Sequence, residues 1–406
     1  MNKYVAFLGG NTMAMPSVER LKMHGYKVII IDRKPCEKAY EIADLVIVAD
    51  IMKPKEVIDA VKNHELCAVM PINDFGIETA SKLSIERKLP GLSEEAALNV
   101  TSKRAMKESW LKANLSTPIF QKFKLADVIN GLFNWDNFPA IVKPSFAGGA
   151  SRGVFKVNSK NEITEHVLNS QQFYLHDDVI VEEFISGTEH TVEAILYKGK
   201  SHIISISDKK NYSFSATVVQ QLYFPGPIGN EQKGKIDALI QDACVALGIE
   251  TGCVHFEIII TTKRIYLLEV GGRPGGGLNF FPIGFLSTGY DYPLEYVRVL
   301  TGEPPLLKKN GETFQLGWFF LETPTGILKE VRGMDEIKKH PNVVVSEILL
   351  PVGTKLNANF KNDMERPVYF LVKAKDKVTV DKLINELQEK LSQLNNPLIT
   401  SANLNF

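Results

Sequence analysis

The sequence predicts a mixed α/β protein of two to four domains that begins with a Rossmann-like parallel sheet. Its 406 residues are more than one hydrophobic core usually serves. Strand and helix patterns alternate over the first hundred residues, which is typical of βαβ units. Beyond residue 101 the pattern changes to strands joined by glycine-rich turns, with a few helices between them.

The predicted elements follow one another without long gaps. "KYVAFLGG" is a buried strand that ends in glycines, and Gly25 ends the helix "MPSVERLKMHGY". "KVIIIDRKP" is a second strand, and the alternation continues through "ADLVIVAD", "PKEVIDAVKNH", "LCAVMPIND" and "GIETASKLSIERKLP". Residues 1–100 are therefore predicted to form the Rossmann-like domain.

Later segments predict a helix at "SKRAMKESWLKANL", a β-loop-β unit at "FPAIVKPSFAGGASRGVFKV" and an amphipathic helix at "EQKGKIDALIQDACVALGI". "GCVHFEIIITTKRIYLLEVGG" reads as a hairpin with "TTKR" as its turn. From about Gly302, the strands "GWFFLE", "VVVSEILLPVG" and "VYFLVKA" mix with one charged helix near "TVDKLINELQEKLSQL".

Composition narrows the functional classes. Hydrophobic residues make up 44% and charged residues 23%, and the formal net charge is zero, so no global field favours nucleic acid or membrane. The four cysteines form no C-x-x-C pair, and free thiols indicate a reducing compartment. The N-terminal apolar run is too short for a signal segment, and no stretch reaches membrane-spanning length. We expect a cytoplasmic protein.

Two glycine-containing segments invite a nucleotide interpretation. "GGNTMA" matches the dinucleotide fingerprint poorly, because Asn11 and Ala14 stand where glycines are needed, and a tight βα turn is favoured. In "IVKPSFAGGASRGV", Lys143 ends an apolar strand before a glycine- and serine-rich loop whose N–H groups could cradle phosphates. On this segment alone, a mobile hairpin loop with a solvated lysine is an equal alternative.

Acidic residues mark two further segments. "VIVEEFISGTE" places Glu182, Glu183 and Glu189 at the end of a strand, where solvated acids are the favoured interpretation of this segment alone. Glu257 and Glu269 lie on the two strands of the predicted hairpin, and alternation can place them side by side. Opposed carboxylates on apolar strands repel unless a cation joins them, and oxygen ligands favour Mg²⁺. A surface position for the two acids is the alternative.

"YLLEVGGRPGGGLNF" surrounds Arg273 with five glycines. Ordering glycine is costly, so either the chain turns sharply here or something approaches it closely. We expect Gly275, Gly276 and Gly277 to present bare backbone to a small substrate, and Arg273 to point into the site, where its planar fork suits phosphate or carboxylate oxygens.

In this order, Lys103, Lys143, the glycine loop, "EEFISGTE", Glu257, Glu269 and Arg273 resemble the ATP-grasp superfamily. Within it the chain resembles carboxylate–amine ligases, the L-amino acid ligases (dipeptide synthetases) in particular. The resemblance covers essentially the whole chain. It implies a Rossmann-like pre-ATP-grasp domain over residues 1–100 and an ATP-grasp domain over 101–301, with a small lid at about 118–185. A C-terminal α+β domain over 302–406 follows.

The resemblance also implies roles for individual residues. Lys103 and Lys143 would bind ATP phosphates, with Lys143 also near the adenine. Glu257 and Glu269 would hold Mg²⁺ (or Mn²⁺), and Arg273 would meet the acylphosphate and the developing oxyanion. The remaining nucleotide contacts would come from the loop (Ala147, Gly148, Gly149, Ser151, Gly153), from the adenine segment (Glu182, Glu183, Phe184, Ile185) and from Glu189 at the ribose.

The chain departs from many relatives in one respect. Gly271 stands two residues after Glu269, where an asparagine commonly provides a third metal ligand, so the number of metal ions is open. The expected reaction joins a carboxylate, an amino acid in our expectation, to an amine through an acylphosphate, with Gln221, Tyr223 and Pro225 near the acceptor. The alternatives are a glycinamide-ribonucleotide-synthetase-like or biotin-carboxylase-like enzyme, and a non-catalytic nucleotide-binding regulator. A homodimer is the default assembly.

Overall fold

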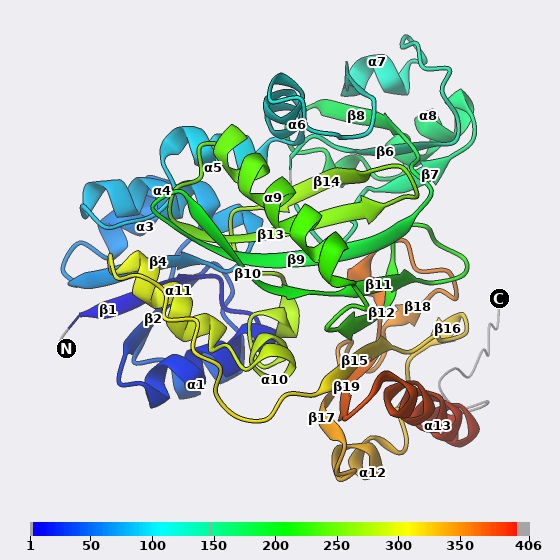
Figure 1. Cartoon of the computed structure of the whole chain (residues 1–406). Coiled ribbons are helices and arrows are strands. Elements are labelled where there is room, and N and C mark those ends of the chain that lie inside the picture. The colour runs from blue at the N-terminus through cyan, green and yellow to red at the C-terminus, as the bar shows by residue number, and fades with distance from the viewer. Residues whose placement is uncertain (1–2, 147, 396–406) are drawn as a thin grey trace.

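The structure is a computed structural model that describes residues 3–146 and 148–395 (Figure 1). Its N-terminal sheet has four parallel strands in the order β3-β2-β1-β4, as the alternating pattern predicted. The strands are almost continuously apolar because helices cover both faces of such a sheet. The strands are β1 (Tyr4–Leu8), β2 (Lys27–Asp32), β3 (Leu45–Val48) and β4 (Leu66–Pro71). The helices are η1 (Thr12–Ala14), α1 (Met15–Met23), α2 (Glu37–Ile42), α3 (Pro54–Ala60), η2 (Asp74–Gly76), α4 (Ile77–Glu86) and α5 (Glu94–Thr101).

A small antiparallel sheet, which we call the lid sheet, lies above the central part of the molecule in Figure 1. Its strand order is β5-β8-β6-β7, and helices α7 and α8 pack on it. The strands are β5 (Phe120–Lys124), β6 (Ala140–Pro144), β7 (Phe155–Val157) and β8 (Asp178–Glu183). The helices are α7 (Leu125–Ile129), α8 (Lys160–Leu168) and η3 (Gln171–Phe173).

The largest sheet has nine strands and forms the centre of the molecule (Figure 1). The order β14-β13-β9-β11-β12-β15-β19-β17 runs from the predicted hairpin to the C-terminal strands, and β10 pairs with β9. The first strands are β9 (Thr188–Tyr197), β10 (Lys200–Ile206), β11 (Asp208–Asn211), β12 (Val219–Phe224), β13 (Gly252–Ile260) and β14 (Ile265–Gly271). Its neighbouring helices are α6 (Lys103–Lys112), α9 (Asn230–Ala246), η4 (Gly277–Asn279), α10 (Ile283–Thr288) and α11 (Tyr292–Leu300).

The C-terminal strands continue this central sheet, because β15 pairs with β12 across the predicted boundary at residue 302. The strands of this part are β15 (Gln315–Phe320), β16 (Gly326–Ile327), β17 (Val343–Ile348), β18 (Lys355–Leu356) and β19 (Val368–Ala374). Its helices are α12 (Met334–Lys338), η5 (Asp363–Glu365) and α13 (Lys377–Asn395). The limits of the domains therefore stay predictions, although the order of the elements agrees with the pattern in the sequence.

Helix α11 joins the N-terminal domain to the central sheet. Tyr292 and Tyr296 pack in one core with β1 residues Val5 and Phe7 and with Ile195 of β9. None of the helices that the structure describes is long and apolar enough to cross a membrane. The four cysteines are free thiols, as their spacing predicted.

Candidate functional site

Lys143 and Glu182 form a buried ion pair between adjacent strands of the lid sheet. Lys143 lies near the end of β6, and its Nζ is 2.6 Å from Glu182 Oε1 on β8. Burial alone would lower the pKa of Lys143, but the carboxylates of Glu182, Glu269 and Glu257 together outweigh burial and the pKa is raised. Lys143 therefore remains a cation inside the protein.

The other oxygen of Glu182 pairs with Lys107, which sequence reasoning had not singled out. Lys107 lies on α6, one turn after Lys103, and is fully buried. Its Nζ is 2.8 Å from Glu182 Oε2 and donates to Thr117 Oγ1 at 2.9 Å. Burial lowers the pKa of Lys107 to about 8, and Glu182 opposes this only in part. Burial would raise the pKa of Glu182, but the two lysines lower it.

Glu257 and Glu269 lie directly opposite each other on β13 and β14, as the alternation along the hairpin predicted. The turn falls between Ile260 and Ile265, at "TTKR". Each acid has a lysine partner: Lys103 Nζ is 3.0 Å from Glu269 Oε1, and Lys209 Nζ is 3.4 Å from Glu257 Oε2. Burial would raise the pKa of Glu257, but Lys209 above all lowers it to about 2.

Lys103 reaches this hairpin from the first turn of α6. Ser102 caps the helix by accepting a hydrogen bond from the Ala105 N–H at 3.3 Å. The Lys103 side chain is buried and also donates to the Phe146 carbonyl at 3.3 Å, just before the glycine loop. The lysine thus links the helix, the loop and a predicted metal carboxylate.

Glu189 lies next to this pair of acids. Lys209 donates to Glu189 Oε1, and Asn211 Nδ2 donates to Glu189 Oε2 at 3.2 Å. Lys209 therefore bridges Glu189 and Glu257, and its side chain is only 6% exposed. Glu189 is partnered within the protein, and its predicted contact with a ribose remains a prediction.

Some backbone N–H groups at the end of β8 and just after it already form hydrogen bonds within the protein. The Glu183 N–H donates to the Ile119 carbonyl at 2.9 Å, and the Phe184 N–H donates to the Pro139 carbonyl at 3.0 Å. Of the three residues expected to offer backbone groups to adenine, two thus already use their N–H groups within the protein. Within the described residues, the Ile185 N–H has no such partner.

The glycine loop is held from three sides. Ser151 Oγ donates to the Thr217 carbonyl at 2.6 Å, and the Asp363 N–H donates to the Ala150 carbonyl at 3.1 Å. The Arg152 guanidinium lies 5.1 Å from the centre of the Phe75 ring in the N-terminal domain. Gly149 and Gly153 have positive φ, which favours glycine, whereas Ala147 lies outside the described residues. That the loop covers phosphates stays a prediction.

Arg273 forms a two-bond ion pair with Asp74 of the N-terminal domain. Arg273 Nε donates to Asp74 Oδ1 at 3.0 Å, and Nη2 donates to Oδ2 at 2.8 Å. Both side chains are nearly buried. Burial would lower the pKa of Arg273, but the carboxylates of Asp74, Glu193 and Glu269 together outweigh burial and the pKa is raised. Arg273 therefore lies beside the hairpin acids with its fork directed at a carboxylate of the chain itself.

Comparisons with known proteins agree with this geometry. The family model described as "ATP-grasp domain" matches residues 136–280. The chain contains an ATP-grasp domain.

Two relatives and one solved structure show the extent of the similarity. The chain is 23% identical over 92% of its length to the uncharacterized protein y4rH of Sinorhizobium fredii, covering 78% of that protein. It is 29% identical over 40% of its length to a D-alanine–D-alanine ligase of Buchnera aphidicola, and the match spans about half (54%) of that enzyme. The crystal structure of an L-amino acid ligase from Bacillus licheniformis superposes with a TM-score of 0.81 at 20% identity, covering 96% of this chain and 97% of that one.

These similarities confirm the predicted ATP-grasp fold and the resemblance to the carboxylate–amine ligases of this superfamily. They also confirm the prediction that the chain is an enzyme, of the class of ATP-dependent ligases. The roles of single residues and the substrates are not decided by similarity at this level, and we treat them as proposals below.

The predicted metal site consists of two acids, Glu257 and Glu269. Among residues 3–146 and 148–395, no group of three or more His, Cys, Asp or Glu side chains is placed to hold a metal ion. Two carboxylates on one strand pair still fit Mg²⁺, which is commonly bound by one or two carboxylates together with substrate phosphates and water.

The Asp74–Arg273 pair accounts for Gly271 at the usual asparagine position of the ATP-grasp motif. A Cβ on Gly271 would lie 3.0 Å from Asp74 Oδ1 and 3.3 Å from Arg273 Cζ. The ion pair thus fills the space that an asparagine side chain would need. A side chain at this position would therefore be tightly packed against the ion pair, which the sequence alone could not reveal.

The next glycines pack against side chains rather than offering bare backbone as we expected. A Cβ on Gly275 would overlap the Glu193 carboxylate, and one on Gly277 would lie 2.5 Å from Trp318 Cη2. Glu193 is fully buried and accepts hydrogen bonds from the Gly275 N–H at 2.9 Å and the Tyr292 hydroxyl at 3.1 Å. Only Gly276 has open space beside it.

Tyr223, expected near the acceptor, contacts the C-terminal helix α13, and its proximity to an acceptor stays a prediction. Its hydroxyl donates to Asp381 on α13, and Lys377 Nζ lies 3.8 Å from the centre of its ring. The tyrosine packs against the core to which α13 contributes Val380 and Ile384.

Sequence reasoning missed four charged residues at the site: Lys107, Lys209, Asp74 and Glu193. Signals for them existed. Lys107 follows Lys103 by four positions on a helix, and Asp74 follows the carboxyl end of a parallel strand. Glu193 is a charge inside the apolar strand β9, which suggests a buried partner.

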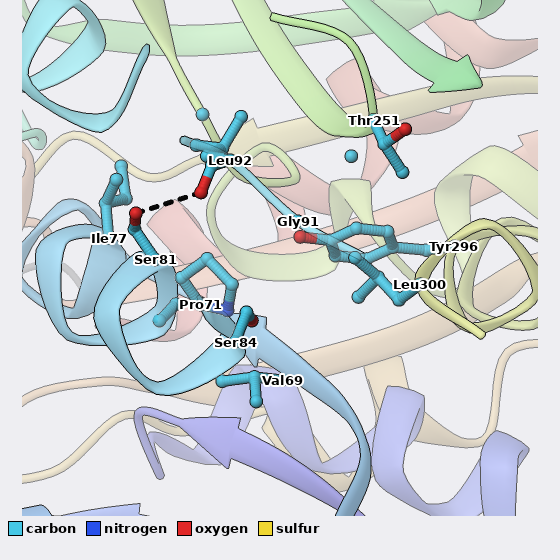
Figure 2. Close-up of a pocket in the computed structure, with 13 residues that line it drawn as sticks. Val69, Pro71, Ile77, Ser81, Ser84, Gly91, Leu92, Thr251, Tyr296 and Leu300 are labelled. Atoms are coloured by element: carbon cyan, nitrogen blue, oxygen red, sulfur yellow. Dashed lines mark hydrogen bonds between the residues drawn. The ribbon is translucent and has the colours of Figure 1, made fainter. Parts of the chain in front are cut away.

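A small cavity lies at the contact between the N-terminal and ATP-grasp domains (Figure 2). Its volume is about 10 Å³, roughly enough for one water molecule. Ser81 Oγ donates to the Leu92 carbonyl at its edge at 2.9 Å, and most of its other lining is apolar. None of the predicted nucleotide or metal residues lines it, so it is separate from the candidate site.

Proposed function

We propose that the protein joins the carboxylate of an amino acid to the amine of a second small molecule, at the expense of ATP. The carboxylate oxygen attacks the γ-phosphorus, ADP leaves and an acylphosphate forms. The amine nitrogen then attacks the acyl carbon, phosphate leaves and the nitrogen loses a proton. Activation is needed because a carboxylate is a poor electrophile.

One observation carries this proposal: Lys103 contacts Glu269, which lies opposite Glu257, and the charge of Glu269 also acts on the buried cations Lys143 and Arg273. Phosphoryl transfer needs mainly positioning and charge neutralisation. Lys103 and Lys143 would bind phosphate oxygens, and Arg273 would bind the acylphosphate once its fork turns from Asp74. Glu257 and Glu269 would hold Mg²⁺ or Mn²⁺, which neutralises phosphate charge when bound.

The loop at residues 147–153 would cover the phosphates and exclude water, which limits hydrolysis of the acylphosphate. Ile185, Glu182 and Glu189 would contact the nucleoside. Support for an amino acid substrate comes from the named ligases above, one of amino acids and one of D-alanine.

We further propose that a substrate contacts Asn279 and Trp318. Asn279 Oδ1 and Trp318 Nε1 are buried, and neither forms a hydrogen bond within the described residues. Both flank the glycine turn after Arg273. Unpaired buried polar atoms are costly, so a ligand that pairs with them would be stabilised.

A phosphate-release screen over pairs of amino acids, with mass spectrometry of the products, tests the proposed function. We expect phosphate, ADP and an amide whose mass equals the two substrates less one water. Release that depends on bicarbonate, or on a ribosylamine with glycine, would instead favour a biotin-carboxylase-like or glycinamide-ribonucleotide-synthetase-like enzyme. ATP binding without turnover in any mixture would favour a regulator.

Glu269→Gln provides the matched negative control for this screen. We expect it to abolish turnover, because one of two acidic metal ligands is lost. It should melt near the wild-type temperature, because the glutamine oxygen can still accept a hydrogen bond from Lys103. The surface variant Glu231→Gln, which loses only an exposed pair with Lys235, should keep full activity. Wild-type ATP consumption by Glu269→Gln would refute the metal assignment.

A cytoplasmic location and a homodimer are further proposals. The free cysteines support a reducing compartment, and light scattering on the purified protein would test the dimer.

A further inference from the structure

The two acids assigned to the metal are each paired with a lysine from a different element. Lys103 on α6 contacts Glu269, and Lys209 on β11 contacts Glu257. Ammonium groups thus lie where the proposed function, on which this inference rests, requires a divalent cation. Lys209 is the more informative of the two, because no assignment above uses it.

Lys209 has a second partner that would keep it in place. Its Nζ contacts Glu189 more closely than Glu257, and Asn211 donates to the other oxygen of Glu189 at 3.2 Å. If Glu257 turned to a metal ion, Lys209 would still be paired with Glu189. The exchange therefore strands no buried ammonium group, which would otherwise be costly.

The charges around the acids balance before any ligand binds. Five of the cations and five of the carboxylates at the site pair with one another: Lys103, Lys107, Lys143, Lys209 and Arg273 with Asp74, Glu182, Glu189, Glu257 and Glu269. Glu193, the further buried acid of the site, contacts His255 instead. A divalent cation entering alone would leave two uncompensated positive charges in a poorly solvated place. A nucleotide triphosphate carries the negative charge that compensates them.

We propose that Lys209 is a positioning residue that holds Glu257 in the metal-free protein, so that a divalent cation binds at Glu257 and Glu269 only together with a nucleotide. Lys209 acts as a built-in counter-cation which the metal replaces at Glu257 when phosphate oxygens arrive. Metal and nucleotide binding are then coupled through the protein, in addition to their association in water.

The test uses Mn²⁺ as the probe, followed by electron paramagnetic resonance on the full chain. Titrations are made with and without a non-hydrolysable ATP analogue and corrected for the metal–analogue complex in solution. For the wild type we expect Mn²⁺ to bind at least about tenfold more tightly with the analogue. Equal affinity with and without it would overturn the inference.

Lys209→Met removes the counter-cation, and Lys210→Met is the matched control. Lys210 is the next residue on β11 and is exposed. Without the analogue, we expect Lys209→Met to bind Mn²⁺ about ten- to a hundredfold more tightly than the wild type, because the acids then exceed the cations by one. Lys210→Met should match the wild type.

A Lys209→Met protein that melts at a lower temperature but keeps the wild-type Mn²⁺ affinity would also overturn the inference, since Lys209 would then be only structural. If that variant does not fold, Lys209→Gln keeps a hydrogen-bond donor to Glu189 and replaces it in the titration. Absence of Mn²⁺ binding even with the analogue would refute the metal assignment in the proposed function. Equal Mn²⁺ binding with and without the analogue would instead refute only the role of Lys209. The titration distinguishes these two outcomes without any amino acid substrate.

Discussion

At the residue scale, a pairing of buried cations with buried carboxylates determines what single substitutions will do. Glu182 lies between Lys143 and Lys107 and pairs with both. A substitution of either lysine therefore changes the environment of the carboxylate with which the other lysine remains paired. Because Glu182 retains one cation in either single variant, effects on ligand binding can be measured in folded protein. A buried acid left without any partner would be far more damaging.

We expect Lys143→Met to weaken ATP binding about ten- to a hundredfold. The methionine keeps the packing of the side chain, while the lost charge-assisted hydrogen bond to phosphate is worth about 1.5–3 kcal/mol. Titration calorimetry measures the change, with Lys122→Met as the control, because Lys122 pairs with Asp178 on the same sheet. Unchanged ATP affinity in Lys143→Met would exclude Lys143 from the site.

Lys107 should give stability a recognisable pH dependence. Its pKa is about 8 in the folded protein against 10.5 for an ordinary lysine. Between these values the unfolded chain binds the additional proton, so the contribution of Lys107 to the free energy of unfolding rises with pH. The wild type should therefore gain up to about 3 kcal/mol relative to Lys107→Met between pH 8 and 10.5.

Urea denaturation of both proteins at several pH values measures this difference. Comparing the two isolates Lys107 from other groups that titrate in the same range. A difference that stays constant, or that falls as pH rises, would contradict the lowered pKa.

Site residues could be predicted where the local sequence pattern marks them. They could not be predicted where their partners are distant in the chain. Lys143 ends an apolar strand before a glycine loop, and Glu257 and Glu269 stand out in apolar strands, so their sequence context marks them. The pair between Arg273 and Asp74 joins positions 199 residues apart, and Lys209 meets Glu257 across 48. No local pattern encodes such contacts.

At the element scale, the β13–β14 hairpin shows how far periodicity reaches. Alternation predicted that Glu257 and Glu269 lie side by side, and their register confirms it. For the turn after β14, we expected the glycines to leave room for a substrate. Buried side chains already occupy the space beside Gly275 and Gly277. Alternation specifies which face a residue takes, but it does not identify what packs against that face.

The turn after β14 offers a test of this packing. Gly275→Ala would push a Cβ into the Glu193 carboxylate, whereas Gly276→Ala meets nothing within 4 Å. Overpacking of this kind typically costs about 1–3 kcal/mol. We expect the first variant to lose stability by about that amount in denaturant unfolding, and the second to unfold like the wild type.

Equal stability of the two alanine variants would mean that the Glu193 contact is easily relaxed. A second measurement, turnover in the folded protein, then reports whether the turn positions Arg273. A loss of turnover confined to Gly275→Ala is the outcome that we expect.

At the scale of the whole molecule, the central sheet and the Asp74–Arg273 pair connect regions that the sequence presents as separate. The sheet runs without a break from β14 to the C-terminal strand β17, so the boundary predicted at residue 302 falls between strands of one sheet. Alternating elements predicted the parallel N-terminal sheet, because two of its pairings, β1 with β2 and β2 with β3, join consecutive strands. Strand order in the central sheet depends on distant pairings such as β12 with β15, which local patterns do not contain.

Arg273 either acts on the substrate or only holds the N-terminal domain against the hairpin, and variants of the ion pair distinguish the two roles. If Arg273 stabilises the acylphosphate and the tetrahedral species formed by amine attack, Arg273→Ala should lower turnover about 10²–10³-fold and leave ATP affinity nearly unchanged. Arg273→Lys should restore only part of the rate, because a point charge lacks the planar fork.

Asp74→Asn is the matched variant, since it removes the charge on the other side of the same two hydrogen bonds and leaves Arg273 in the protein. If Arg273 acts on the substrate, Asp74→Asn should lower turnover far less than Arg273→Ala, because the guanidinium is still present. If the pair only fastens the N-terminal domain to the hairpin, both variants should melt at similarly reduced temperatures, and their folded fractions should keep near-normal specific activity. Melting temperature, ATP affinity and product formation measured on the same samples decide between the two. A destabilised but active Arg273→Ala protein would refute the catalytic role.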